Sequence, residues 1–202
     1  MSFDDTGVHF QSEKFRLENV QVGLLGAHQV QNAAVALQIV HTQQHLRAVS
    51  ISSILRGLTN VSHPGRLQWV GTNLLVDAAH NPAGAQKLAD YILQVKQERK
   101  LPITLLLGVS DDKDLRGIGV ILSQVVDRIF ATQCSHPRAK TSSEIVKELK
   151  VDVPVHDMGS VETALQHCRW DEEIVVVAGS IFLVGAVQSI LNSSDHYKPD
   201  FD

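Results

Sequence analysis

The 202 residues of this chain are 44% hydrophobic and 20% charged, the composition of one globular domain or of one domain and part of another. The 18 basic and 22 acidic residues give a formal net charge of -4 and form no basic run, which argues against a nucleic-acid or anionic-membrane binder. Cys134 and Cys168 have neither disulfide nor zinc spacing, and neither a secretory signal nor a membrane-length apolar run is visible. We therefore expect a cytoplasmic protein with reduced cysteines.

The first sixty residues carry three predicted elements. Residues 1–14 are polar and show little pattern, whereas apolar and polar residues alternate over 15–25 and predict a strand. Apolar residues at three- and four-residue spacing predict a helix over 29–45, and a second helix is expected over 50–58 with Ser50 as its N-cap. Three elements of this size rarely close a core, so we expect residues 1–60 to be the remnant of a larger domain.

After a turn-rich segment at 60–65, which we interpret as a domain boundary, strands and helices alternate. Strands that are apolar throughout, between amphipathic helices, are typical of a parallel sheet covered on both faces. The predicted fold class is therefore α/β, with a Rossmann-like, doubly wound, mainly parallel sheet over 61–192 and a flexible tail over 193–202. The predicted strands are 67–70, 74–76, 103–109, 128–131, 153–155 and 174–178, and the predicted helices are 82–97, 115–126, 141–149, 160–169 and 181–191.

Ligands of such sheets bind outside the carboxyl ends of the strands, and the strand over 74–76 delivers Asp77 and His80 to such an end. Asn81 and Pro82 then suit the cap and first turn of the next helix. Two interpretations remain open for Asp77 and His80. They either satisfy backbone groups of their own loop, or Asp77 accepts hydrogen bonds from a ribose diol beside a helix start that favours phosphate.

Four further polar residues follow strands or the boundary. Lys113 offers a point charge for a carboxylate or phosphate, and Arg138 a bidentate partner for a substrate carboxylate. Ser180 offers a hydroxyl after Gly179, and Arg66 at the boundary offers contacts to phosphate oxygens. The alternatives are a solvated turn for Lys113, a surface or linker charge for Arg138 and Arg66, and a helix cap for Ser180.

Several common site motifs are missing from the sequence. A Gly-x-x-x-x-Gly-Lys-Ser/Thr phosphate loop does not occur, and the Gly117–Gly119 pair lacks the third glycine of a dinucleotide fingerprint. His41 and His45 stand four residues apart, as metal ligands on a helix can, but no third ligand is evident. We therefore predict no metal site within these residues.

Five short motifs stand in order along the chain: 26–34 (GAHQVQNAA), 64–66 (PGR), 77–82 (DAAHNP), 112–114 (DKD) and 179–182 (GSIF). Together they resemble the motifs of folylpolyglutamate/dihydrofolate synthases of the Mur ligase family. Order and spacing agree over residues 23–191, with Ala78 where glycine is common and Phe182 where tyrosine is common.

The resemblance implies a P-loop ATPase domain, of which residues 1–60 are the last part, followed by a Rossmann-like domain, with ATP in the cleft between them. ATP would phosphorylate a carboxylate of dihydropteroate or a folate, and the amine of L-glutamate would attack the acyl phosphate. Mg²⁺ would bridge the phosphates, held by residues outside this sequence. Asn32 matches the family residue beside adenine, Arg66 the linker residue at the nucleotide, and Asp77 the residue at the ribose.

The same resemblance implies that His80 and Lys113 belong to the catalytic site and that Arg138 and Ser180 face the incoming glutamate. We expect a full-length monomer without a nucleic-acid or membrane partner, and no ligation by the 202 residues alone, because they contain no phosphate loop. Two alternatives remain open. One is another Mur-type amide ligase, such as a peptidoglycan or cyanophycin ligase, and the other is a non-catalytic nucleotide-binding module.

Overall fold

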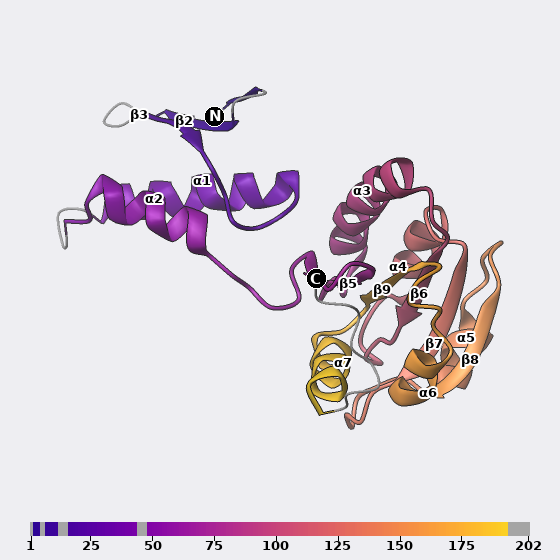
Figure 1. Cartoon of the computed structure of the whole chain (residues 1–202). Helices are drawn as coiled ribbons and strands as arrows, with labels where there is room; N and C mark the ends of the chain where they lie inside the picture. The colour runs from indigo at the N-terminus through magenta and orange to yellow at the C-terminus, as the bar shows by residue number, and fades with distance from the viewer. Residues whose placement is uncertain (1, 5–6, 12–15, 44–47, 194–202) are drawn as a thin grey trace. The chain divides into compact units, whose positions relative to one another are not determined.

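The computed structural model describes residues 2–4, 7–11, 16–43 and 48–193 (Figure 1). The chain divides into two compact units, an N-terminal unit of Met1–Pro64 and a C-terminal unit of Gly65–Asp202. Ser193 ends the last helix, and the rest of the predicted flexible tail lies outside the described residues.

The N-terminal unit combines a three-stranded antiparallel sheet with two helices. The prediction of a single strand was wrong, because residues 1–14 hold two strands where we expected no pattern. The second of these strands places Phe10 in the core opposite Leu17, and backbone pairing on both sides holds it. Hydrophobic periodicity does not record such pairing. The elements are β1 (Ser2–Asp4), β2 (Gly7–Gln11), β3 (Arg16–Val20), α1 (Ala27–Thr42) and α2 (Ile51–Asn60).

Ser50 caps α2 as predicted, since its Oγ accepts a hydrogen bond from the backbone N–H of Ser53 at 3.2 Å. Helix α1 begins two residues before the predicted start and ends at Thr42, before the predicted end at residue 45. The buried core of the unit is small. It comprises Phe10, Leu17, Val20, Val30, Ala33 and Leu37.

The C-terminal unit is built on a six-stranded sheet in the order β4-β5-β9-β6-β7-β8. Only the edge strand β4 is antiparallel to its neighbour, and the last strand along the chain, β9, lies between β5 and β6. The predicted mainly parallel, doubly wound sheet is confirmed. The strands are β4 (Gln68–Val70), β5 (Leu74–Val76), β6 (Ile103–Leu107), β7 (Arg128–Gln133), β8 (Val155–Ser160) and β9 (Ile174–Ala178).

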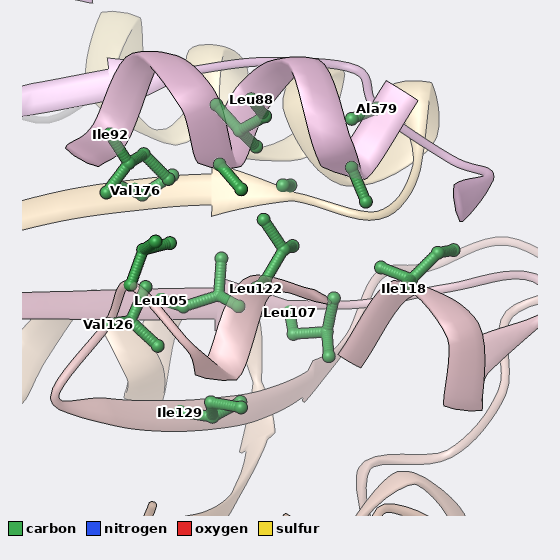
Figure 2. Packing of buried hydrophobic residues seen from close by; sticks show 14 of the residues in the cluster. Ala79, Leu88, Ile92, Leu105, Leu107, Ile118, Leu122, Val126, Ile129 and Val176 are labelled. Atoms are coloured by element: carbon green, nitrogen blue, oxygen red, sulfur yellow. The ribbon is translucent and has the colours of Figure 1, made fainter. Parts of the chain in front are cut away.

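Helices cover both faces of this sheet because successive strand residues point to opposite sides. In β9, Ile174, Val176 and Ala178 pack in the cluster with α3, α4 and α5, and Val175 and Val177 pack in the cluster with α6 and α7. Figure 2 shows the first cluster, in which side chains of α3 and α4 meet those of β6 and β9. The helices are α3 (Pro82–Arg99), α4 (Leu115–Ser123), α5 (Ser142–Glu148), α6 (Val161–Gln166) and α7 (Ile181–Ser193).

Several predicted boundaries were wrong, most clearly at β8. The strand expected over 153–155 instead begins at Val155 and continues to Ser160. Its side chains are half-buried or exposed, because it is an edge strand paired with β7 alone, so its hydrophobic signal is weak. Strand β6, helix α4 and helix α6 also end earlier than predicted.

The two cysteines are packing residues. Cys134 and Cys168 are free thiols buried in the cluster beneath α6 and α7. Burial raises the pKa of both thiols, that of Cys168 to about 12, because the apolar surroundings disfavour the thiolate. Both cysteines therefore lack the character of a reactive nucleophile.

A buried carboxylate ties together the amino ends of three parallel strands. Glu173 is 3% exposed, and its Oε2 accepts hydrogen bonds from the Thr104 hydroxyl at 2.6 Å and from the Arg128 guanidinium. Its Oε1 accepts the backbone N–H of Arg169 at 2.7 Å. The guanidinium Nε of Arg128 in turn donates to the Thr104 hydroxyl at 2.7 Å. This polar cluster fixes β6, β7 and β9 relative to one another at the amino edge of the sheet.

Replacing Glu173 by glutamine should lower the free energy of unfolding by about 1–3 kcal/mol, because the half-buried Arg128 charge loses its counterion. Urea unfolding measures the change. The matched control is Glu172→Gln, whose side chain is 68% exposed and pairs with Arg169, and which should change stability by less than about 0.5 kcal/mol. Equal losses in the two variants would contradict the role assigned to the cluster.

Candidate functional site

Four adjacent parallel strands of the C-terminal unit end at one edge of the sheet. The pairings Val76 with Val177 and Leu107 with Ala178 keep the ends of β5, β9 and β6 level, and Leu107 pairs with Ala131 in β7. The four loops that follow these strands therefore lie at the same edge, the place where ligands bind in open α/β sheets.

Asp77, directly after β5, organises its own loop. It is 6% exposed, and its Oδ2 accepts the backbone N–H of Leu67 while its Oδ1 accepts that of Ala79, each at 2.8 Å. These bonds join β5 to the segment that enters the unit. The carboxylate thus bonds to backbone N–H groups of its surroundings, the first of the two roles that the sequence left open.

His80 follows in the same loop and is half-buried. Its Nδ1 lies 2.9 Å from the carbonyl oxygen of Ala78, and because a carbonyl only accepts, Nδ1 carries the hydrogen. When the ring is neutral, its lone pair is therefore on Nε2. Asn81 caps α3 as predicted, with its Oδ1 accepting the backbone N–H of Gly84 at 2.8 Å.

The loop after β9 approaches its neighbours closely. Gly179 has a φ of 112°, and a Cβ atom there would lie 2.5 Å from the carbonyl oxygen of Gly108, so only glycine fits. Ser180 is buried and its Oγ accepts the backbone N–H of Phe182 at 3.1 Å. Ser180 therefore caps the first turn of α7, the alternative role that the sequence left open for it, and it also lines the cavity described below.

The loops after β6 and β7 carry the cationic residues. The Lys113 ammonium lies 2.8 Å from the Asp112 carboxylate, and its hydrogen bond and charge lower the pKa of that carboxyl. The carbonyl of Arg138 accepts the backbone N–H of Asp111 at 2.9 Å, and Ser110 forms a β-bridge with Ala139. The two loops are therefore joined through their backbones.

A cavity of about 260 Å³ lies among these loops. It contains three cationic side chains, Arg66, Lys113 and Arg138, and one carboxylate, Asp112, so it favours an anionic ligand. The sequence did not single out the lining residues Ser110, Asp112 and Ile181 as site residues. The complete lining is Arg66, Ala78, His80, Ser110, Asp112, Lys113, Arg138, Gly179, Ser180, Ile181 and Phe182.

Five predicted site residues line this cavity and two do not. Arg66, His80, Lys113, Arg138 and Ser180 meet there, whereas Asp77 is buried beside it and does not belong to the lining.

Asn32 lies in the other unit, where its Nδ2 donates to the Gln29 Oε1 at 3.0 Å. It borders an apolar cavity of about 420 Å³ formed by α1, α2 and the segment before α1.

Two further predictions concern metals and membranes. Within the described residues, no group of three or more His, Cys, Asp or Glu side chains is arranged to hold a metal ion. His45, one half of the histidine pair considered as metal ligands, lies outside the described residues. Among the helices of the described part, none has the length and apolar character needed to cross a membrane.

Residues 65–181 match the family described as Mur ligase, glutamate ligase domain. This chain belongs to that family. The resemblance inferred from five ordered motifs is thereby confirmed, and the matched range holds every residue that lines the cavity except Phe182.

Relatives of this Mur ligase domain include the dihydrofolate synthase/folylpolyglutamate synthase of Bacillus subtilis, 24% identical, with 90% of this chain and 43% of that protein covered. The folylpolyglutamate synthase of Lacticaseibacillus casei is 26% identical, with 90% and 42% covered. Among solved structures, Escherichia coli FolC in complex with DHPP and ADP is 27% identical with a TM-score of 0.78, covering 95% of this chain and 45% of that one. The chain therefore spans less than half the length of these relatives.

Replacing Asp77 by asparagine should lower the free energy of unfolding of the ligand-free chain by about 1–3 kcal/mol. An amide has a single acceptor oxygen, so one of the two backbone N–H groups that bond to Asp77 would lose its acceptor. Urea unfolding of the variant measures this. The control Asp112→Asn, at an exposed surface pair, should stay within about 0.5 kcal/mol of wild type. If Asp77→Asn is as stable as the control, the carboxylate does not organise the loop.

Proposed function

We propose that this Mur ligase domain belongs to a protein that joins L-glutamate to dihydropteroate or a folate in an ATP-dependent reaction with an acyl phosphate intermediate. The observation that carries the proposal is the cationic cavity at the carboxyl ends of β5, β6 and β9, within a match to a glutamate ligase domain. A relative of 28% identity and TM-score 0.78 was solved as a folylpolyglutamate synthase/dihydrofolate synthase with Mn, AMPPNP and L-glutamate bound.

The cavity suits glutamate in charge and in size. Its volume of about 260 Å³ lies below the roughly 300–1,000 Å³ of pockets for drug-sized ligands, which favours an amino acid over a whole folate. The guanidinium of Arg138 offers paired donors to a carboxylate, and Lys113 offers a compact charge to a second anionic group. We assign the Ser180 hydroxyl, at the start of α7, to the same amino acid.

Two residues of the cavity fit the chemistry of amide formation. The glutamate ammonium must lose a proton before it attacks, and we assign its removal to His80, because the Nδ1 hydrogen bond leaves Nε2 to accept a proton. Charge then develops on the oxygen atoms of the acyl phosphate as the phosphate departs. The Lys113 ammonium stabilises that charge electrostatically, which is the main contribution a protein makes to phosphoryl chemistry.

The phosphate groups of the nucleotide would lie next to the glutamate site. ATP supplies the phosphoryl group, and we assign Arg66 to its phosphate oxygens because this side chain borders the same cavity. Asp77 would act at the ribose chiefly through the loop that it organises, and Asn32 would act at the adenine. The described residues contain no metal cluster, and we assign the divalent ion to a part of the protein outside them.

We also propose that the N-terminal unit is the last part of the ATP-binding domain. Helix α1 is apolar on more than one face, with Val35 61% exposed and Ile39 57% exposed, although Ala33 and Leu37 are buried. Apolar side chains outside the buried stripe of a helix indicate a second surface that a neighbouring element can cover. The preceding part of a larger domain would cover these surfaces. The complete protein would then be a cytoplasmic monomer whose partners are ATP, L-glutamate and the pterin substrate.

The proposed activity predicts ADP release that depends on both L-glutamate and dihydropteroate or a folate. The protein in which this chain follows a P-loop domain should form the γ-glutamyl or dihydrofolate product, and the 202 residues alone should not. Coupled ADP assays and mass spectrometry of the product check both. Product from the 202 residues alone would contradict the prediction that the reaction needs a further domain. A product with a different acceptor acid from the larger protein would overturn the proposed activity.

Replacing Arg138 by alanine should raise the KM for L-glutamate roughly 10- to 100-fold, because a charged hydrogen bond to a carboxylate is worth about 1.5–3 kcal/mol. The KM for ATP should change less than about twofold, since ATP does not use this contact. Arg169→Ala is the matched control, because Arg169 is exposed at the amino edge of the sheet. Steady-state kinetics in which the two variants behave alike would remove Arg138 from the glutamate site.

A further inference from the structure

We propose that His136 is a positioning residue for glutamate recognition, which holds Arg138 and Ser180 in fixed places relative to each other without touching the amino acid. His136 does not belong to the lining of the cavity, and the motifs of the sequence did not single it out. The inference rests on the proposed function of that cavity.

The His136 ring makes contacts in two directions. It stacks on the Phe182 ring, with centroids 3.6 Å apart and an interplanar angle of 14°. Its Nδ1 also accepts the backbone N–H of Arg138 at 3.2 Å. One imidazole therefore connects the loop after β7 to the first turn of α7, two segments far apart in the sequence.

The loop after β7 is held on its other side by backbone bonds. The Arg138 carbonyl accepts the N–H of Asp111, and Lys140 donates its N–H to the Val109 carbonyl, each at 2.9 Å. These bonds fix the loop against the end of β6. The stack of His136 on Phe182 fixes it against the end of β9, so Arg138 is located between two attachments.

Phe182 extends this connection to the second glutamate ligand. Its backbone N–H donates to the Ser180 Oγ at 3.1 Å, and its ring lines the cavity. If the stack were displaced, the positions of the Arg138 guanidinium and the Ser180 hydroxyl would therefore change together. Recognition groups must be held to within a fraction of an ångström, which is why an outer contact of this kind affects a site that it does not touch.

The hydrogen bonding of His136 argues against a direct catalytic role. A neutral imidazole that accepts an N–H on Nδ1 carries its hydrogen on Nε2. The lone pair that a general base needs is therefore already engaged by the Arg138 backbone. His80 shows the opposite arrangement, with its hydrogen on Nδ1 and its ring lining the cavity.

Three substitutions at His136 separate the stack from the hydrogen bond. His136→Phe keeps a stacking ring, His136→Asn keeps an acceptor without the ring, and His136→Ala removes both. In the protein that performs the ligation, we expect His136→Ala and His136→Asn to raise the KM for L-glutamate about fivefold or more, with kcat and the KM for ATP within about twofold. His136→Phe should restore a KM within about twofold of wild type.

A double-mutant cycle tests whether His136 acts through Arg138. In an Arg138→Ala background, His136→Ala should raise the KM for L-glutamate by clearly less than it does alone, because one of the two groups that it positions is gone and only Ser180 remains. Fully additive effects, or an unchanged KM in His136→Ala alone, would overturn the proposal. A decrease in kcat with an unchanged KM would also overturn it, because it would indicate that His136 takes part in the chemical step.

Hydrogen–deuterium exchange of the 202-residue chain gives a readout that needs no activity. His136→Ala should speed exchange over residues 134–140, whereas His136→Phe should speed it only at the Arg138 amide, whose acceptor it removes. The amides of β8 should exchange at the wild-type rate in both. Unchanged exchange in His136→Ala, or faster exchange throughout the C-terminal unit, would refute the positioning role. A protein that ligates no glutamate would instead refute the proposed function, and with it the kinetic part of this inference, while the exchange result still decides whether His136 holds the loop.

Discussion

The insertion of β9 between β5 and β6 is the constraint on which the rest of the C-terminal unit depends. Its backbone bonds continue past the ends of the strands, since the Val177 carbonyl accepts the N–H of Asp77 at 3.0 Å and Gly179 donates to the Ala79 carbonyl at 2.8 Å. Strand β9 thereby aligns a loop that precedes it by about a hundred residues in the sequence. A slip of one residue would also exchange the two apolar faces of β9, so the register is strongly specified.

The sequence predicted the strands that are buried on both faces, and it missed or misplaced strands whose side chains are partly exposed. Strands β6 and β9 are buried on both faces, and their runs of apolar residues, interrupted in β6 only by Thr104, predicted them. Strand β8 is an edge strand with half-exposed side chains, and β2 contributes Phe10 to a small core, so pairing rather than composition determines them. Such pairing is a long-range property that local periodicity does not contain.

The candidate site divides in the same way. Short motifs pointed to His80 and Lys113, which follow strand ends, and to Arg66, which stands at the domain boundary. The contact between His136 and Phe182 was not predictable, since it requires the loop after β7 to pack on a helix that begins more than forty residues later. Asp77 looked like a ligand from its position, whereas its carboxylate accepts two backbone N–H groups of its own surroundings.

The Glu173 cluster aligns the strands at the amino edge of the sheet, whereas the candidate site lies at the carboxyl edge. Stability of the scaffold and recognition of a ligand therefore depend on different residues. Strand alignment is secured by Thr104, Arg128 and Glu173, at the end of the sheet away from the cationic cavity. Loops at the carboxyl edge are then free to diversify while the scaffold keeps its shape. Substitutions in these loops can therefore change the lining of the cavity while the alignment of the strands is kept.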